Sequence, residues 1–557
     1  MKRNMASIGD TIAAGHKMIN DSNLKEFGTT LGCTLEQATP DLHKTIASAV
    51  VTTPAVLMGR QHTISYLRER SSAEQFLSAW NKRFQRVAII EKDLAPFFGD
   101  SGKEKDSLEE DAIGQLSFQG DLFKPLNHVP WLLFALSLFK IWLVPTMTVL
   151  LPIVVWILPY FLLRFVYNLP ITQDQYVSIL QGLMSGNVVM PSLAAIQGEA
   201  AQPSPLTLKG VVQYGLFAFT FIQSMIQPVQ NAMHLYKTDT ITRGIGEKIL
   251  ELRGIVQDFR KDLGNFNGIH VKLSWGIHHV EEADPRRAFM LIQEYPTVIH
   301  TILTDLAHLE ILWRISLNRL LNPVKFVRNA LALKDCRDIS LDTTAPVTSS
   351  LELVDVMKPH AILTGPNGGG KSSFLRATLQ CVLLGHTFGY APAKEAHMPR
   401  FTWIASGIQL RDTPGKLSMF ETEVKFAADC LAAGRKHGPG FVVFDELFHS
   451  TNPPDGVRTA TQFLNRLWNQ KDVFSIVSTH VFPLVASAPA SVQAICCPAE
   501  RVENGDISFT YRVQPGICMI SSVHTVWEKF GLAEREEVRS EAVEQSLPVK
   551  EKDTDAK

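Results

Sequence analysis

The chain has 557 residues, with 54 Lys plus Arg, 55 Asp plus Glu and a formal net charge of −1 at pH 7. This length exceeds what one hydrophobic core supports, so we expect several structural units. The balanced charge provides no overall basic excess that would indicate nucleic-acid binding, although it leaves a local basic patch open. Seven cysteines without a Cys-x-x-Cys pair favour a reducing compartment and indicate no zinc site.

The first 125 residues are expected to be soluble and mostly helical. Apolar residues recur at helical intervals from Phe76 through Trp80 and Phe84 to Val87. The segment 99–111, GDSGKEKDSLEED, is a polar, charged linker. The N-terminus has no sustained apolar core, so a cleaved secretory signal is not expected.

A membrane region is predicted over residues 126–233. Residues 141–163 contain no charge, and as a helix they extend about 35 Å, enough to cross a hydrocarbon core. Prolines recur there every seven residues, at Pro145, Pro152 and Pro159, and membrane spans tolerate them. A buried core helix and a re-entrant hairpin are the alternatives.

A second apolar stretch covers residues 210–229, where three glutamines weaken the pattern. It is interpreted either as a second span or as a buried or interfacial helix. The sequence therefore predicts one or two transmembrane helices, and two would put both soluble parts on the same side.

The remaining chain divides into three segments. Residues 234–335 have the apolar spacing of long helices, which are expected to act as levers, to form a dimer seam or to make an ordinary helical subdomain. Residues 336–535 alternate short apolar runs with helical patterns, which is typical of an α/β domain with a mostly parallel sheet. The charged tail 536–557 is expected to be disordered.

A phosphate-binding loop is predicted in the segment ILTGPNGGGKSS. Gly365, Gly370, Lys371 and Ser372 have P-loop spacing between the β-prone run 360–364 and an apolar-periodic helix. Lys371 is expected on the β- and γ-phosphates of a bound nucleotide, and Ser372 on Mg²⁺. The candidate phosphate-binding segment comprises Gly365, Pro366, Asn367, Gly368, Gly369, Gly370, Lys371, Ser372 and Ser373.

Hydrolysis requires a second element, and the segment GFVVFDELFHSTNPPDG supplies it. A continuous apolar run ends in Asp445 and Glu446. Asp445 is expected to hold the Mg²⁺ shell and Glu446 to act as the general base. A third run, VFSIVSTH, ends in His480, which is expected to sense the γ-phosphate.

Four motifs in this order, TGPNGGGKSS, LSMFETE, FDELFHSTNPPDG and STH, resemble the ATPase domain of the MutS family of DNA mismatch-repair proteins, a family of ABC-class ATPases. The resemblance covers roughly 340–535 and includes the later segment FTYRVQPG. It implies a P-loop ABC-type ATPase fold and hydrolysis of ATP with Mg²⁺. The helices of 234–335 lie where the family has its core and lever helices.

The resemblance also implies a homodimer, because the family's sites are composite. Asp412 and Ser418, with Phe420 and Glu423, match the signature segment, whose serine faces the nucleotide of the opposite subunit. The neighbouring loop across the dimer corresponds to Ser450, Thr451 and Asp455. Two departures, Gly368 where the family has Met and Ser373 where it has Thr, remove no phosphate contact.

The N-terminal region departs most from the family pattern, since no Phe-x-Glu mismatch reader is found in it. Apolar spans ahead of the ATPase resemble a less studied, membrane-anchored branch of MutS-like proteins. Two functions are therefore expected: a membrane-anchored ATPase that acts on DNA, with the ATPase domain on the cytosolic side, or a membrane scaffold or remodeller that binds no DNA. An ABC transporter half is disfavoured, because two spans are too few and the LSGGQ signature is absent from the sequence.

Overall fold

The computed structural model describes residues 16–98, 113–184, 208–264, 284–294, 296–341, 347–354, 357–410, 417–501, 507–520, 527 and 530–531. The chain folds into two compact units. Unit 1 comprises residues 1–88, 265–272 and 303–557, and unit 2 comprises residues 89–264 and 273–302. The charged linker 99–111 and the tail 536–557 lie outside the described residues.

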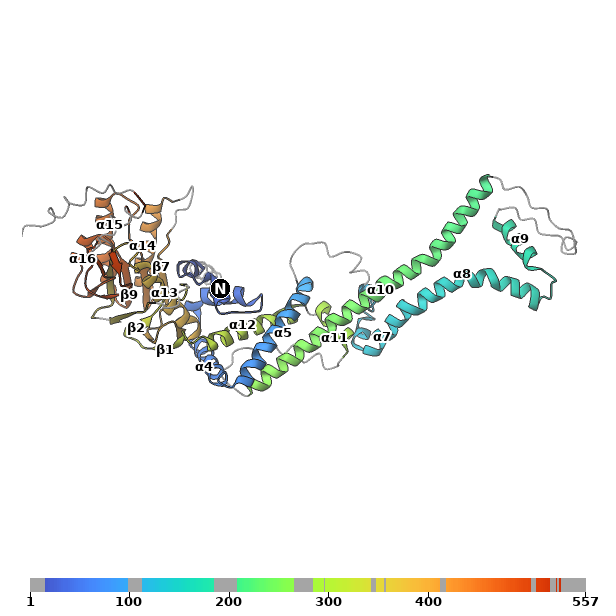
Figure 1. Cartoon of the computed structure of the whole chain (residues 1–557), viewed down its shortest axis with the longest axis horizontal. Coiled ribbons are helices and arrows are strands. Elements are labelled where there is room, and N and C mark those ends of the chain that lie inside the picture. Colours follow the sequence, from blue (N-terminus) through green and yellow to red (C-terminus); the bar gives the residue numbers. More distant parts are fainter. Residues whose placement is uncertain are drawn as a thin grey trace, which may run out of the picture. The chain divides into compact units, whose positions relative to one another are not determined.

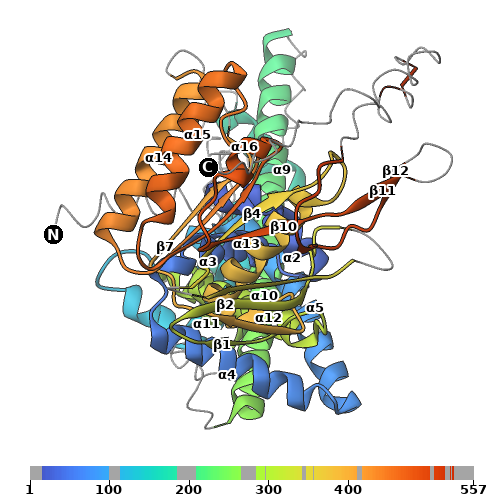
Figure 2. The ribbon, with the colours of Figure 1, turned by 90° about the vertical axis from the view of Figure 1, so that its left-hand side faces the viewer.

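A six-stranded sheet forms the centre of unit 1 (Figure 2). Its strands, in spatial order, are β13 (Gln514–Pro515), β10 (Val492–Cys496), β4 (His360–Thr364), β9 (Val473–Ser478), β8 (Gly440–Phe444) and β7 (Trp403–Gly407). All neighbours pair in parallel except β13, which is antiparallel to β10. Strands β4, β8 and β9 are buried along their whole length, as their largely apolar sequences predict.

Helices connect the parallel strands of this sheet. They are α13 (Lys371–Phe388), α14 (Met419–Lys436), α15 (Pro453–Trp468) and α16 (Phe482–Ala486). Helix α15 is amphipathic, and its apolar face packs with α14 around Phe444, Phe448 and Phe463. The aromatic side chains of Phe401, Phe441 and Phe474 meet at centroid distances of 5.5 and 5.7 Å and fill the sheet's other side.

A five-stranded mixed sheet lies in the same unit. Its order is β3 (Ser349–Val354), β2 (Ala330–Cys336), β6 (Glu395–Met398), β1 (Asn322–Phe326) and β5 (Tyr390–Ala391). A hairpin of β11 (Ala499–Arg501) and β12 (Ile507–Phe509) completes the strands of the described residues. Helix α13 is buried along almost its whole length, because it contacts strands of both larger sheets and N-terminal helices.

The N-terminal region belongs to unit 1 as far as residue 88. Its helices are η1 (Leu24–Glu26), α2 (Phe27–Thr30), α3 (Ala38–Ala47), η2 (Ala49–Val51), α4 (Pro54–Arg70) and the first part of α5 (Glu74–Phe98). They pack against α12 (Pro296–Leu317), where Trp80 and Trp313 lie 5.0 Å apart. Buried Glu310 of α12 accepts hydrogen bonds from Thr34 N, Thr34 Oγ1 and Leu35 N, so it fixes the α2–α3 loop.

Unit 2 is helical in its described residues (Figure 1). Its elements are the end of α5, η3 (Lys124–His128), α7 (Pro130–Leu138), η4 (Phe139–Leu143), α8 (Val144–Phe161), η5 (Leu162–Val166), α9 (Gln173–Met184), α10 (Leu208–Leu263), α11 (Pro285–Glu294) and the start of α12. Helix α10 continues unbroken through residue 234, where the sequence indicated a change from membrane to soluble character.

One helix among the described residues, Pro130–Val155, is long and apolar enough to cross a membrane. Only 6% of its most apolar stretch of 18 residues is buried. It begins before the predicted start at Ile141, and helical structure continues to Val166. The π-helical segment η4 ends just before Pro145. A wider turn there accommodates the proline ring, which would otherwise collide with the carbonyl of Ile141.

Candidate active site

The glycine-rich loop 365–370 joins β4 to α13 at the carboxyl edge of the parallel strands. Gly365, Gly368 and Gly370 have φ of 148°, 80° and 98°, which L-residues with a side chain rarely adopt. A Cβ at Gly365 would lie 2.8 Å from the carbonyl oxygen of Cys497, so this position also requires glycine for space. Gly370 is the N-cap of α13 and provides no side-chain cap to the first N–H groups.

Lys371 lies folded across this loop and is only 5% exposed. Its Nζ donates hydrogen bonds to Gly365 O at 3.1 Å and Pro366 O at 3.2 Å. Burial lowers the pKa of Lys371, while Glu446 and Asp445 raise it by charge attraction. The structure thus brings the lysine and both predicted carboxylates within electrostatic reach of one another.

Asp445 and Glu446 follow β8, and both are tied to the end of β9 by Ser478. Ser478 Oγ donates to Asp445 Oδ1 at 2.5 Å and accepts from Glu446 N at 3.0 Å. Glu446 has a left-handed φ of 52°, which turns the chain sharply after Asp445. Sequence reasoning missed Ser478, although it is the first residue of the STH motif.

Glu446 and His480 face each other across the strand ends. His480 Nε2 lies 3.1 Å from Glu446 Oε1, and both side chains are partly exposed. The hydrogen bond with His480 lowers the pKa of Glu446, and the charges of His480, Lys371 and His449 add to this, while burial opposes it. Glu446 is therefore held ionised, in the form that accepts a proton.

Glu423 of α14 anchors the loop that follows Glu446. This carboxylate is 2% exposed, accepts a hydrogen bond from Ser450 Oγ at 2.5 Å and has Oε1 3.2 Å from His449 Nδ1. His449 Nδ1 also lies 2.8 Å from Glu446 O. Glu423 therefore supports the backbone of Glu446 from a neighbouring helix.

The other signature residues have local roles in this structure. Ser418 N-caps α14, its Oγ accepting from Glu421 N at 3.3 Å and its own N donating to Glu421 Oε2 at 2.8 Å. Phe420 packs edge-on against Phe448 at 6.2 Å. Asp455 lies in the first turn of α15, where its N donates to the Asn452 cap at 3.0 Å. Asp412 lies outside the described residues.

An aromatic residue missed by the sequence reasoning lies beside the loop. The ring of Tyr511 is 3.5 Å from the position that a Cβ on Gly370 would take. Tyr511 has φ of 55° and is 49% exposed, so about half of this residue is open to solvent next to the start of α13. Its only sequence signal was its position ahead of the VQPG segment.

The candidate site offers a metal ion oxygen donors from two side chains. Among the residues that the structure describes, no group of three or more His, Cys, Asp and Glu side chains gathers in the geometry of a metal site. Ser372 in the first turn of α13 and Asp445 after β8 offer one hydroxyl and one carboxylate. Mg²⁺ typically takes one or two such protein ligands and fills its shell with water and phosphate oxygens, so this pair fits Mg²⁺ and not a caged metal.

The fold and site together define an α/β domain with a glycine-rich loop, a buried lysine and an acidic pair at one edge of a mostly parallel sheet. Residues 361–547 match the family model of MutS domain V. This match covers a third of the chain and assigns that part to MutS domain V.

Relatives match this chain over about a third of its length. It is 32% identical over 187 residues to the DNA mismatch repair protein MutS of Thermus aquaticus, covering 33% of this chain and 23% of that protein. It is 31% identical over 201 residues to MutS of Thermus thermophilus, covering 36% and 24%. The mitochondrial DNA mismatch repair protein MSH1 of Arabidopsis thaliana is 30% identical over 199 residues, covering 35% and 17%. The chain thus matches less than a quarter of the length of these relatives.

Proposed function

We propose that this protein is a MutS-type ATPase that binds Mg-ATP at the glycine-rich loop and hydrolyses it, works as a dimer, and is anchored in a membrane. The observation that carries the proposal is the meeting of Lys371, Asp445 and the Glu446–His480 pair at one sheet edge. This is the combination that phosphoryl transfer requires: a cation for the phosphates, a carboxylate for the metal shell and an ionised base for water.

The nucleotide is proposed to bind with its phosphates against the backbone N–H groups of the loop and of the first turn of α13. Lys371 then exchanges its contacts with Gly365 O and Pro366 O for phosphate oxygens. Ser372 and Asp445 would hold Mg²⁺, which neutralises charge on the transferred phosphoryl group when bound. Tyr511 offers a face on which a base can stack.

Glu446 is proposed to orient the attacking water and accept its proton. Ser478 and Glu423 hold its backbone, and His480 holds its carboxylate ionised. His480 is also positioned to respond to the γ-phosphate.

The dimer is proposed from the family resemblance: Asp412 and Ser418 of one subunit would complete the site of the other. Ser418 is exposed at the N-terminus of α14, where a partner's phosphate would meet the positive end of the helix.

The membrane anchor is proposed from two antiparallel helices of unit 2. Ile141 and Leu235 pack together with Leu116, each at most 7% exposed, at the base of the pair. The stretch from Ile141 to Arg164 and the stretch from Leu235 back to Val212 each contain 24 residues and extend about 36 Å. Over much of both stretches, the large apolar residues have exposed fractions of 40–65%. Matched length and exposed apolar surface favour a two-span hairpin in lipid.

DNA is proposed as the partner because the relatives are named as DNA mismatch repair proteins. A second candidate is a membrane scaffold or remodeller that binds no DNA. It is favoured by α10, which continues as one helix from its exposed apolar half into its buried soluble half. The basic residues of α10 support DNA binding only in part, because Lys248 already forms an ion pair with Asp93 at 2.6 Å.

The test is the ATPase rate of the detergent-purified full chain, with and without homoduplex or mismatched DNA, at two salt concentrations. Mg²⁺-dependent turnover is expected, and chelation of Mg²⁺ is the control. Stimulation that weakens with salt favours the DNA function, because counterion release governs such binding. Turnover that is indifferent to DNA but changes on reconstitution into vesicles favours the scaffold. A chain that neither binds nor hydrolyses ATP contradicts the proposal.

A further inference from the structure

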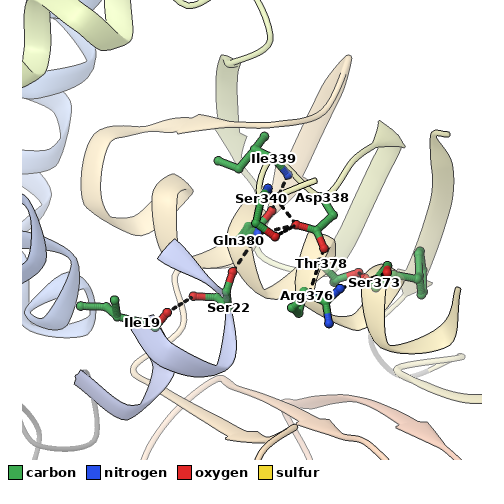
Figure 3. A network of polar contacts seen from close by, with 10 residues as sticks. Ile19, Ser22, Asp338, Ile339, Ser340, Ser373, Arg376, Thr378 and Gln380 are labelled. Carbon is green, nitrogen blue, oxygen red and sulfur yellow. Dashed lines mark hydrogen bonds and ion pairs between the residues drawn. The ribbon is translucent and has the colours of Figure 1, made fainter. Parts of the chain in front are cut away.

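A chain of hydrogen bonds connects the N-terminal segment of unit 1 to the first turn of α13 (Figure 3). Gln380 Nε2 donates to Ser22 O and to Asp338 Oδ1, both at 2.8 Å. Arg376 Nε donates to Asp338 Oδ2 at 3.0 Å, and Arg376 Nη2 donates to Ser373 Oγ at 3.0 Å. Ser373 follows Lys371 and Ser372, so this series of hydrogen bonds ends at the residues proposed to hold phosphate and Mg²⁺.

Three of the residues joined by these hydrogen bonds are deeply buried. Ser22 and Gln380 are 0% exposed and Asp338 is 5% exposed. The Gln380 amide has one usable orientation, because its Oε1 accepts from Ile339 N at 3.0 Å while its Nε2 faces two acceptors. Loss of one partner would leave a buried polar group without a hydrogen bond. The hydrogen-bonded residues therefore resist small displacements relative to one another.

The same N-terminal segment reaches the other side of the candidate site through Lys17. Lys17 Nζ donates to Ser406 O at 2.6 Å, pairs with Asp21 Oδ2 at 2.6 Å and lies 5.3 Å from the centre of the Phe426 ring. Ser406 belongs to β7 and pairs with Val443 of β8, two residues before Asp445.

Phe426 of α14 extends this second connection. It packs edge-on against Phe444, the last residue of β8, at 5.2 Å. Residues 16–22 therefore contact the lysine side of the site through Ser22 and Gln380, and the carboxylate side through Lys17, β7 and Phe426.

We propose that residues 16–22 form a brace that sets the distance between the first turn of α13 and the carboxyl end of β8, with Lys17 and Arg376 as positioning residues for ATP hydrolysis. This rests on the proposed function of the site. The brace touches neither phosphate nor metal. It acts through Ser373 and Ser406, and it should therefore govern the rate of the chemical step more than nucleotide affinity.

The first test is hydrogen–deuterium exchange of the full chain in detergent, which needs no ATPase activity. Lys17→Met removes the contact to β7 from a partly exposed side chain, and Arg376→Lys keeps a positive charge near Asp338 while losing the fork that also reaches Ser373. Lys25→Met, at an exposed lysine of the same N-terminal region, is the matched control.

Each positioning variant is expected to raise the exchange rate at least threefold in a defined set of peptides. For Arg376→Lys these peptides cover residues 365–376. For Lys17→Met they cover residues 403–410 and 440–446. The Lys25→Met variant should match wild type. Unchanged exchange in these peptides would overturn the brace. An increase spread over all of unit 1 would also overturn it, because it would mean a general loss of packing.

The second test separates positioning from binding. Both variants are expected to lower kcat at least fivefold while KM for ATP stays within twofold, and Lys25→Met should keep both values. A matching rise in KM with unchanged kcat would overturn the positioning role. Wild-type protein without turnover would defeat the proposed function, and the exchange result would then still decide whether the brace holds the loop.

Discussion

Glu446 and His480 lie 3.1 Å apart, Oε1 to Nε2, just beyond the carboxyl ends of the adjacent parallel strands β8 and β9. The contact joins residues 34 positions apart in the chain and is the main cause of the lowered pKa of Glu446. It makes Glu446 the side chain whose chemistry is most directly testable.

Replacement of Glu446 by Gln is expected to keep ATP binding within threefold and to lower turnover by about a hundredfold or more, the scale of general-base catalysis. The amide preserves shape but accepts no proton. Nucleotide affinity from fluorescent ATP titration and turnover from phosphate release measure the two effects separately. Glu69→Gln, at an exposed position in α4, is the matched control and should change neither. Turnover retained in Glu446→Gln would remove Glu446 from the mechanism.

The pH dependence of hydrolysis should report the hydrogen bond between these two residues. A base with a lowered pKa stays ionised until the pH falls below the ordinary range of glutamate, so wild-type kcat/KM should hold at mildly acidic pH. His480→Ala removes the largest cause of the lowered pKa of Glu446. The acid limb of the profile should then move to higher pH. A His480→Ala profile with an unmoved acid limb would show that the hydrogen bond does not tune this base.

Residue patterns predicted the secondary structure around the candidate site well. The runs HAILT and GFVVF are strands β4 and β8, and the glycine spacing correctly placed a loop and then a helix at Lys371. These features are local, because an apolar run or a positive-φ glycine determines the backbone conformation of only a few neighbouring residues.

Contacts between distant segments were not predictable in the same way. The bond from Gln380 to Ser22 joins residues 358 apart, and nothing in either segment's local pattern specifies the other. Tyr511 was missed for the same reason, since its neighbour Gly370 lies far away in the chain. The sequence analysis ended the second apolar stretch at residue 229 and the membrane region at residue 233. Helix α10 continues across both positions, and Leu235, Ile245 and Ile249 are buried in its later part.

Replacement of Lys371 by Met is expected to weaken ATP binding at least tenfold. The buried ammonium would make charge-assisted hydrogen bonds with phosphate oxygens, which are each worth about 1.5–3 kcal/mol. Isothermal titration of the purified chain with ATP and Mg²⁺ measures the loss. Lys325→Met, at an exposed lysine of β1, should bind as wild type does. Equal affinities in the two variants would contradict a phosphate role for Lys371.

A charge introduced into the exposed apolar helix should impair membrane insertion. Leu151 is 62% exposed in α8, and Leu151→Arg would place a cation near the middle of the proposed span, at a cost of about 2.5–3.5 kcal/mol. The fraction that stays with membranes after alkaline carbonate extraction should fall. Leu341→Arg, at a residue 45% exposed in unit 1, is the control and should extract like wild type. Wild-type protein that carbonate removes completely would refute the anchor.

The base of the helix pair in unit 2 provides a comparison between a buried and an exposed ion pair. Arg286 Nε and Nη2 donate to Asp239 Oδ1 and Oδ2 at 3.0 and 2.9 Å, and Ser137 Oγ donates to Oδ1 at 3.2 Å. Both charged side chains are at most 15% exposed. Arg286→Met would leave the Asp239 carboxylate buried without its partner, which typically lowers the free energy of unfolding by about 3–5 kcal/mol.

The matched control for this last change is Lys248→Met, which breaks the Lys248–Asp93 pair of the same unit at 36–37% exposure. Its loss should cost about 1 kcal/mol or less, because solvent screens the pair. Proteolysis of unit 2 at increasing urea concentration, followed on gels with the full chain in detergent, measures both variants against wild type. Arg286→Met should be cleaved at clearly lower urea than Lys248→Met. Equal midpoints would mean that the Asp239–Arg286 pair does not hold α7 and α11 on α10.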